Sequence, residues 1–161
     1  ISMPSGRNQI IFDMDNVLLV SQLIDGKFPD YQPIIPQRHN TRTVLGTADF
    51  AKACRTADIF ARESSNTARV SVEPGDGLSG AYATIAANSK ETGDNVAQVD
   101  ASVEGMPVEI AFNVKFMSDA LSVIDTPQVA LETTSANEPG VLKPVGDNDF
   151  VHIIMPMNFN R

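Results

Sequence analysis

The sequence predicts an α+β fold in which two helices cover one side of antiparallel sheets. From Thr43 onward, the apolar pattern gives the order strand, helix, strands, and the rest of the chain repeats that order. The two halves share no visible sequence repeat, so the predicted duplication is one of structure. The strands alternate apolar and polar residues, as between Gln98 and Val103, and polar turns separate them. These features favour antiparallel sheets over the strand–helix alternation of a parallel fold.

Composition points to a globular protein without a membrane segment. The chain has 161 residues, of which 42% are hydrophobic, and no apolar run approaches the roughly 20 residues that cross a bilayer. Residues 1–8 are polar and contain Pro4, so they do not form a secretory signal. Cys54 is the single cysteine and suits a core position in a reducing compartment, which predicts a cytoplasmic protein.

Charge and histidine content restrict the partners. The net charge of −8 argues against a simple nucleic-acid binder, unless the basic residues gather on one face. The two histidines, His39 and His152, are far apart, and no Cys/His spacing typical of a zinc site is present. We therefore expect no metal and no cofactor.

The first predicted elements are two strands around a tight turn, between Asn8 and Leu23. Asp15-Asn16 readily adopts the positive φ that a hairpin turn requires. Prolines follow at positions 29, 33 and 36, and proline fixes φ and lacks an amide donor. We therefore expect 28–36 to be an extended, non-helical linker between domains.

The first predicted helix runs from about Ala48 to Ala61, with Thr47 as its N-terminal cap. Its apolar face recurs at helical spacing and consists of Phe50, Ala53, Cys54, Ala57 and Phe60. Lys52, Arg55 and Arg62 lie largely off that face, where charged residues usually form only a solvated surface.

The second predicted helix runs from about Val114 to Ile124, between a cap at Asn113 and a stop at Pro127. The residues of its inner face are Phe116, Met117, Ala120, Leu121 and Ile124. The strands predicted before this helix are 68–72, 80–87, 96–103 and 108–112, and those after it are 128–132, 141–144 and 150–155.

The segment from Ile10 to Leu18 resembles the first motif of haloacid-dehalogenase-type phosphatases. In that family the first aspartate, here Asp13, attacks phosphate, the second, here Asp15, acts as acid and base, and Mg²⁺ neutralises charge. The acidic turn 146–149 would then supply late metal ligands. Three features oppose this function: Asn16 stands where the family has Gly or Thr, a strand follows instead of a helix, and no doubly wound alternation follows. A hairpin tip explains the aspartates better, and the magnesium-dependent phosphatase is the enzymatic alternative.

Three separated segments resemble the bacterial DNA polymerase III beta subunit family, the beta sliding clamps. The first, 21–31, reads SQLIDGKFPDY and precedes Ile34-Ile35-Pro36. The second, 110–116, reads IAFNVKF, and the third is Ile153-Ile154-Met155-Pro156-Met157 near the end of the sequence. They occur in the family's order and at about its spacing, so the resemblance covers nearly the whole chain.

The resemblance implies a DNA-clamp fold. Residues 1–36 would be the tail of the clamp's middle domain plus a linker, and 37–161 its third domain; the first domain and most of the second would be missing. In the family, three such domains per chain and two chains form a homodimeric ring around duplex DNA. The ring is not an enzyme and raises processivity by tethering the polymerase, so its contacts with DNA should be few, weak and independent of sequence.

The resemblance also implies three sets of surface residues. The DNA-facing residues would be Lys52, Arg55 and Lys115. Ile59 and Phe60 would contribute to the contact between subunits. The groove that binds short peptides of the replicative polymerase and the clamp loader would include Pro29, Ile34, Asn113, Phe116, Ile153, Ile154, Met155, Pro156, Met157 and Phe159.

Three departures from the family pattern concern this groove. Pro33 stands where a basic residue is common, and Phe116 lacks the hydroxyl of the usual tyrosine. The sequence ends in Asn158-Phe159-Asn160-Arg161 instead of Arg-Leu, with Phe159 near the place of the terminal leucine. The middle-domain wall of the groove would also be absent, so we expect peptide binding about 10-fold or more weaker than in a complete clamp.

Overall fold

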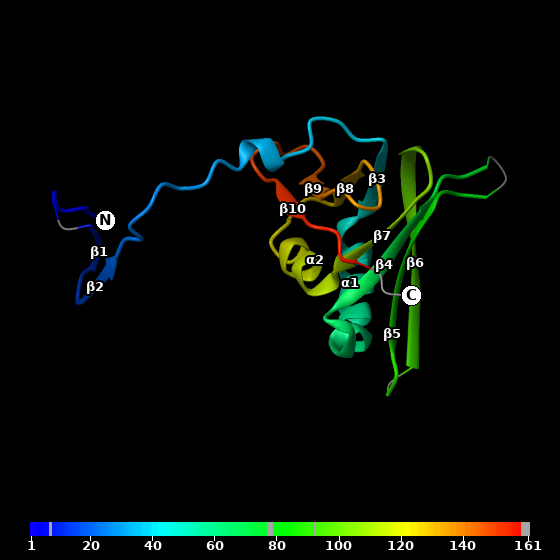
Figure 1. Ribbon diagram of the computed structural model, residues 1–161, viewed down its shortest axis with the longest axis horizontal. Helices are drawn as coiled ribbons and strands as arrows, with labels where there is room; N and C mark the ends of the chain where they lie inside the picture. The colour runs from blue at the N-terminus through cyan, green and yellow to red at the C-terminus, as the bar shows by residue number, and fades with distance from the viewer. Residues whose placement is uncertain (7, 77–78, 92, 159–161) are drawn as a thin grey trace. The chain divides into compact units, whose positions relative to one another are not determined.

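The computed structural model describes residues 1–6, 8–76, 79–91 and 93–158 and divides the chain into two compact units (Figure 1). The first unit is Ile1–Pro33 and the second is Ile34–Arg161.

The first unit contains the predicted hairpin, which is confirmed. Strand β1 (Gln9–Met14) pairs antiparallel with β2 (Val17–Gln22), and Asp15 in the turn has a φ of +51°. The linker prediction is wrong in one respect, because Gln32–Ile34 forms the short 3₁₀ helix η1. The Asp30 carboxylate accepts a hydrogen bond from the Gln32 amide at 3.1 Å, and the fixed φ of proline is compatible with a 3₁₀ turn.

The second unit has the order strand, helix, strands twice, as the sequence predicts. Its first half is β3 (Thr41–Gly46), α1 (Thr47–Ala61), η2 (Arg62–Ser64), β4 (Thr67–Glu73), β5 (Tyr82–Ser89) and β6 (Gly93–Gly105). Its second half is β7 (Val108–Asn113), α2 (Val114–Leu121), β8 (Gln128–Thr133), β9 (Gly140–Pro144) and β10 (His152–Ile154).

The strands form one antiparallel sheet with the order β10-β9-β8-β3-β6-β5-β4-β7. Each half therefore places its first strand beside the other half, since β3 pairs with β8 and β7 pairs with β4. Strand β6 is long enough to join the two parts, because 93–100 pairs with β5 and 101–105 pairs with β3. The two halves consequently share one core.

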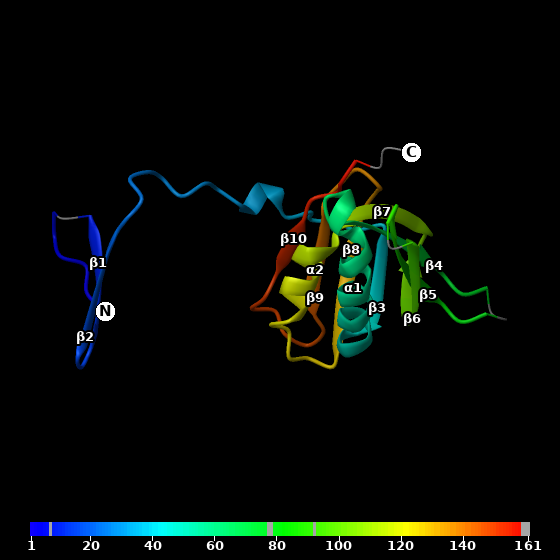
Figure 2. The same cartoon turned by 90° about the horizontal axis from the view of Figure 1, so that it is seen from below.

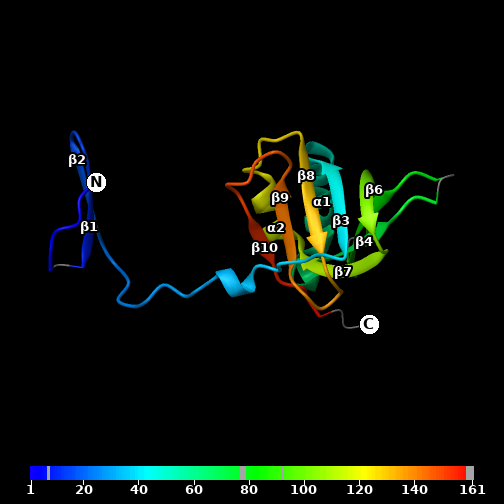
Figure 3. The ribbon, with the colours of Figure 1, turned by 90° about the horizontal axis from the view of Figure 1, so that it is seen from above.

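Both helices lie on the same face of this sheet. They lie in front of β8 and β9 in Figure 2 and behind these two strands in Figure 3. Helix α1 packs against α2 and against β3 to β6. The largest side chains buried between the layers are Phe50, Phe112, Leu45, Ile85, Met117, Leu131 and Leu142. Cys54 is buried among them, and burial raises the pKa of its thiol to about 12, so it is a core residue as predicted.

Two details of the helices differ from the predictions. Thr47 does not cap α1 but is its first residue, because its hydroxyl donates to the carbonyl of Thr126 at 2.7 Å. The amide of Thr47 also donates to the carbonyl of Pro127 at 3.0 Å. Helix α2 ends at Leu121 and not at Ile124, since the chain must leave the helix to place these two carbonyls beside Thr47.

The predicted inner face of α2 is wrong for one residue. Met117, Ala120, Leu121 and Ile124 are buried, but the side chain of Phe116 is 56% exposed. A helix turns by about 100° per residue, so the neighbour of buried Met117 leaves the inner face. Phe116 is therefore an exposed aromatic ring in the first turn of α2.

Candidate peptide groove and helix surface

The C-terminal segment crosses the end of β7, immediately before α2 begins. Pro156 forms an antiparallel bridge with Phe112, and the amide of Met157 donates to the carbonyl of Ala111 at 2.8 Å. These contacts place the Ile153–Met157 segment beside the start of α2, although the two are about 40 residues apart in the sequence.

The side chains of this segment differ in exposure. Ile154 is buried, whereas Met155 is 60% exposed. Ile153, Pro156 and Met157 are half-buried. The prediction that the final strand contributes to the core is thus confirmed for Ile154, whereas the apolar atoms of Met155 stay accessible.

Asn113 fixes the first turn of α2, as the sequence predicts. Its side-chain oxygen accepts hydrogen bonds from the amides of Lys115 at 3.1 Å and Phe116 at 3.3 Å. Helix α2 also contacts β10. The structure therefore brings together a polar amide, an exposed aromatic ring and an exposed methionine, a combination that suits a short peptide with apolar anchors.

The packing beneath this surface does not follow from the sequence pattern. Gly140 in β9 pairs with Ile154, and a methyl group at Gly140 would lie 2.6 Å from the ring of Phe112. The only signal in the sequence was a glycine directly before an apolar strand. The sequence assigns no role to His152, and burial lowers the pKa of its imidazole. Its Nε2 atom is buried without a hydrogen-bond partner in the described ranges.

The remaining predicted groove residues are Ile34, Pro29 and Phe159. Ile34 begins the second unit and is 50% exposed, whereas Pro29 belongs to the first unit. Phe159 lies outside the described residues.

The basic residues that resemble DNA-facing positions are exposed on the helices. Lys52 and Arg55 lie one turn apart on α1, and Lys115 lies in the first turn of α2. Within the described part of the chain, none of the three forms an ion pair. Their charges are therefore available to an external anion.

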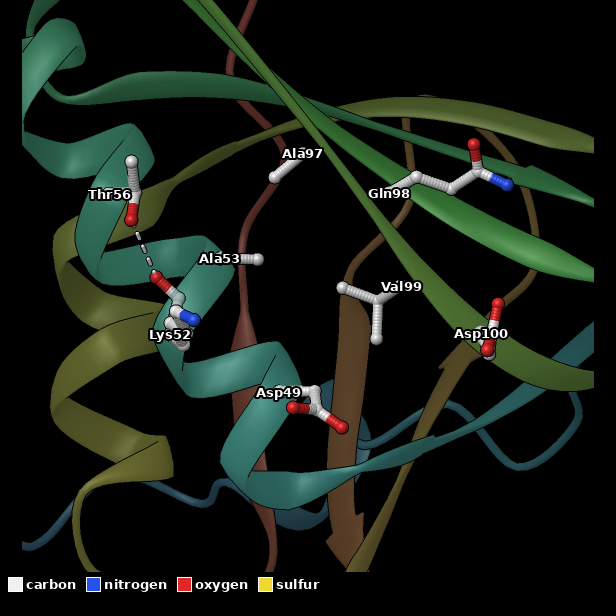
Figure 4. Close-up of a pocket in the computed structure, with 8 residues that line it drawn as sticks. All are labelled: Asp49, Lys52, Ala53, Thr56, Ala97, Gln98, Val99 and Asp100. Atoms are coloured by element: carbon white, nitrogen blue, oxygen red, sulfur yellow. Dashed lines mark hydrogen bonds between the residues drawn. The ribbon is translucent and has the colours of Figure 1, made fainter.

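A cavity of about 340 Å³ lies beside Lys52, between α1 and β6 (Figure 4). Asp49 and Asp100 line it from the two elements, and the hydroxyl of Thr56 donates to the carbonyl of Lys52 at 3.0 Å. The two carboxylates reduce the positive potential around Lys52, which favours weak over tight binding of an anion.

The two residues predicted for the subunit contact have different surroundings. Ile59 is 55% exposed and lies two helical turns after Lys52, on the same side of α1. Phe60 is half-buried and packs against the core. Ile59 is thus the more accessible of the two.

The phosphatase alternative finds no support in the fold. Asp13 and Asp15 are exposed in a hairpin, and β1 leads into the antiparallel strand β2 instead of a helix. The residues that the structure describes contain no group of three or more His, Cys, Asp or Glu arranged to hold a metal ion. No helix in the described ranges is long and apolar enough to cross a membrane.

Comparison with known proteins gives one consistent family. The family model described as "DNA polymerase III beta subunit, C-terminal domain" matches residues 32–158. The chain is 32% identical over 151 residues to beta sliding clamps of Staphylococcus aureus and Bacillus subtilis. The match covers 93% of this chain but only 39% of the S. aureus protein.

Solved structures give the same result. The DNA polymerase sliding clamp of Bacillus subtilis superposes with a TM-score of 0.83 at 32% identity, over 95% of this chain and 40% of that one. A Pseudomonas aeruginosa sliding clamp, solved with a ligand, has a TM-score of 0.83 at 27% identity over 96% of this chain and 40% of that one. With its antiparallel sheet, its helix pair and the family match over 32–158, this chain belongs to the DNA polymerase III beta subunit family.

Proposed function

We propose that this chain acts in DNA replication as part of a ring-shaped sliding clamp, a non-catalytic processivity factor of the bacterial cytoplasm. Residues 37–161 would be the third domain of the clamp, and 1–36 the end of its middle domain with the linker. The observation that carries this proposal is the match of residues 32–158 to the C-terminal domain of the beta subunit. A homodimeric ring would hold the polymerase near DNA by topology instead of chemistry, with Ile59 and Phe60 at the subunit contact.

The helix surface would face duplex DNA. Lys52, Arg55 and Lys115 are exposed and without ion pairs in the described ranges, which supports contacts with phosphate groups. The rest of the chain is acidic, with a net charge of −8. Repulsion between the acidic remainder of the chain and the phosphates would keep the affinity for DNA low, so that the clamp can slide along the duplex.

Replacing Lys52 and Arg55 together with alanine should weaken DNA binding and its dependence on salt. Each lost phosphate contact lowers the slope of log K against log salt by about 0.9, so we expect a loss of roughly 2. Fluorescence anisotropy with a labelled duplex, measured across a salt series, gives this slope. Lys90→Ala is the control, since Lys90 is exposed in the turn after β5. An unchanged slope in the double variant would contradict the assignment.

The surface formed by Asn113, Phe116 and the Ile153–Met157 segment would be one wall of the peptide groove for polymerase and clamp loader. Its support is the exposure of Phe116 at 56% and of Met155 at 60%, which leaves more than half of each side chain accessible among the described residues. Methionine is flexible and polarizable, which suits a groove that accepts peptides of varied sequence. Ile34, Pro29 and Phe159 would extend this wall.

Phe116→Ala and Met155→Ala should each weaken peptide binding by about 10-fold, because alanine at the few residues that dominate an interface costs more than about 1 kcal/mol. Fluorescence polarisation with a labelled peptide that carries the clamp-binding motif of a replicative polymerase measures the Kd. Val96→Ala is a matched control, since Val96 in β6 is also exposed, at 69%. Equal effects of all three variants, or no effect of the first two, would refute the groove.

A further inference from the structure

The chain leaves α1 through a turn in an unusual backbone conformation. Ser65 and Asn66 follow η2 with φ values of +57° and +55°. Residues other than glycine rarely adopt this left-handed conformation, and asparagine tolerates it better than most. Two such residues in succession therefore persist only where surrounding contacts hold them.

One of these contacts closes the end of α1. The amide of Asn66 donates to the carbonyl of Ala61 at 2.9 Å, as left-handed residues after helices commonly do. This contact alone would make the turn an ordinary helix stop.

The carbonyl groups of the turn accept hydrogen bonds from the start of α2. The amide of Val114, the first residue of α2, donates to the carbonyl of Asn66 at 2.8 Å. The side-chain amide of Asn113 points to the carbonyl of Ser65 at 3.4 Å. Asn113 in turn holds the amides of Lys115 and Phe116.

The start of α2 is thus held from two sides. The left-handed turn binds it on one side, and the β7 residues before it bind Pro156 and Met157 of the C-terminal segment. The turn therefore adds to the pairing of β4 with β7, which ends at Thr67 and Asn113, two hydrogen bonds at the first residues of α2.

We propose that Asn66 is a positioning residue of the peptide groove, which fixes Asn113 and Phe116 through the left-handed turn. Asn66 acts through its backbone and need not touch the peptide. The inference rests on the groove proposed above and adds to it a residue outside the motifs that identify the family.

The test compares Asn66→Gly with Asn66→Val in the whole chain. Glycine adopts positive φ freely, whereas the β-branched valine does not. We expect Asn66→Val to raise the Kd of the labelled clamp-binding peptide at least about 10-fold, and Asn66→Gly to change it less than about 2-fold. Equal Kd values for the two variants would overturn the proposal.

Asn8 provides the matched control, since it is also an asparagine at positive φ, with a value of +43°, but lies in the first unit. Asn8→Val should carry similar backbone strain and leave the Kd within about 2-fold of the parent chain. If Asn8→Val weakens the peptide as much as Asn66→Val, the effect is general strain and the proposal fails.

A second measurement covers the case in which Asn66→Val does not fold. In the milder Asn66→Ala variant, hydrogen exchange at the amide of Val114 should accelerate about 10-fold, and in Asn66→Gly it should not. Unchanged exchange in Asn66→Ala would overturn the proposal. Phe116→Ala separates the two hypotheses: if it leaves the Kd unchanged the groove itself fails, and if it weakens binding while Asn66→Val does not, only the positioning role fails.

Discussion

Replacing Gly105 with alanine should destabilise the second unit by about 4 kcal/mol or more. Gly105 ends β6 with a φ of +115° and pairs with Thr41 where β6 joins β3. A methyl group there would lie 2.0 Å from the carbonyl oxygen of Asn40 and 2.9 Å from the Cα atom of Thr41. These are backbone atoms of β3 and of the residue before it, so relief requires β3 and β6 to move apart at the junction of the two halves.

Urea denaturation followed by far-UV circular dichroism measures this loss. Gly93→Ala is the control, because Gly93 begins the same strand with a φ of +86° but has open space where the methyl group would stand. It should cost only the backbone strain of about 1–2 kcal/mol. Similar losses in the two variants would show that the contact with Asn40 is unimportant.

The sequence predicts the types of the elements well because the signals are local. The hairpin, both helices and every strand of the second unit occur close to their predicted places. The Asn113 cap follows from a side chain and amides two and three residues away. The order of the strands was not predicted, since the pairing of β3 with β8 depends on residues about 90 positions apart.

The errors arise where tertiary contacts outweigh local pattern. Thr47 is a residue type that often caps helices, but its hydroxyl donates a hydrogen bond to the carbonyl of Thr126 and is not free to cap α1. Phe116 fits the apolar spacing of α2, yet the helix buries Met117 and leaves Phe116 exposed. Periodicity counts apolar residues and does not show which of them another surface covers. Phe116 was assigned to the groove only through the family resemblance.

Gly140→Ala should destabilise the chain by about 2–3 kcal/mol and weaken peptide binding at the same time. A methyl group at this buried position would lie 2.6 Å from the Cζ atom of Phe112 and 3.4 Å from Ile154. Phe112 cannot yield easily, since it is fully buried and also pairs with Pro156. We therefore expect Pro156 and the rest of the C-terminal segment, which forms the proposed groove, to shift instead.

A double-mutant cycle in urea denaturation tests whether the contact with the ring of Phe112 causes the loss of unfolding free energy in Gly140→Ala. Phe112→Leu alone leaves a cavity and should cost about 1–2 kcal/mol, but it also makes room for the methyl group. The loss in the Gly140→Ala, Phe112→Leu double variant should therefore be smaller than the sum of the single losses by at least about 1 kcal/mol. Gly46→Ala is the control, because its nearest neighbour is a side-chain oxygen of Asp49 at 3.4 Å, an ordinary contact. Strict additivity of the two losses of unfolding free energy would show that the ring of Phe112 does not carry the strain.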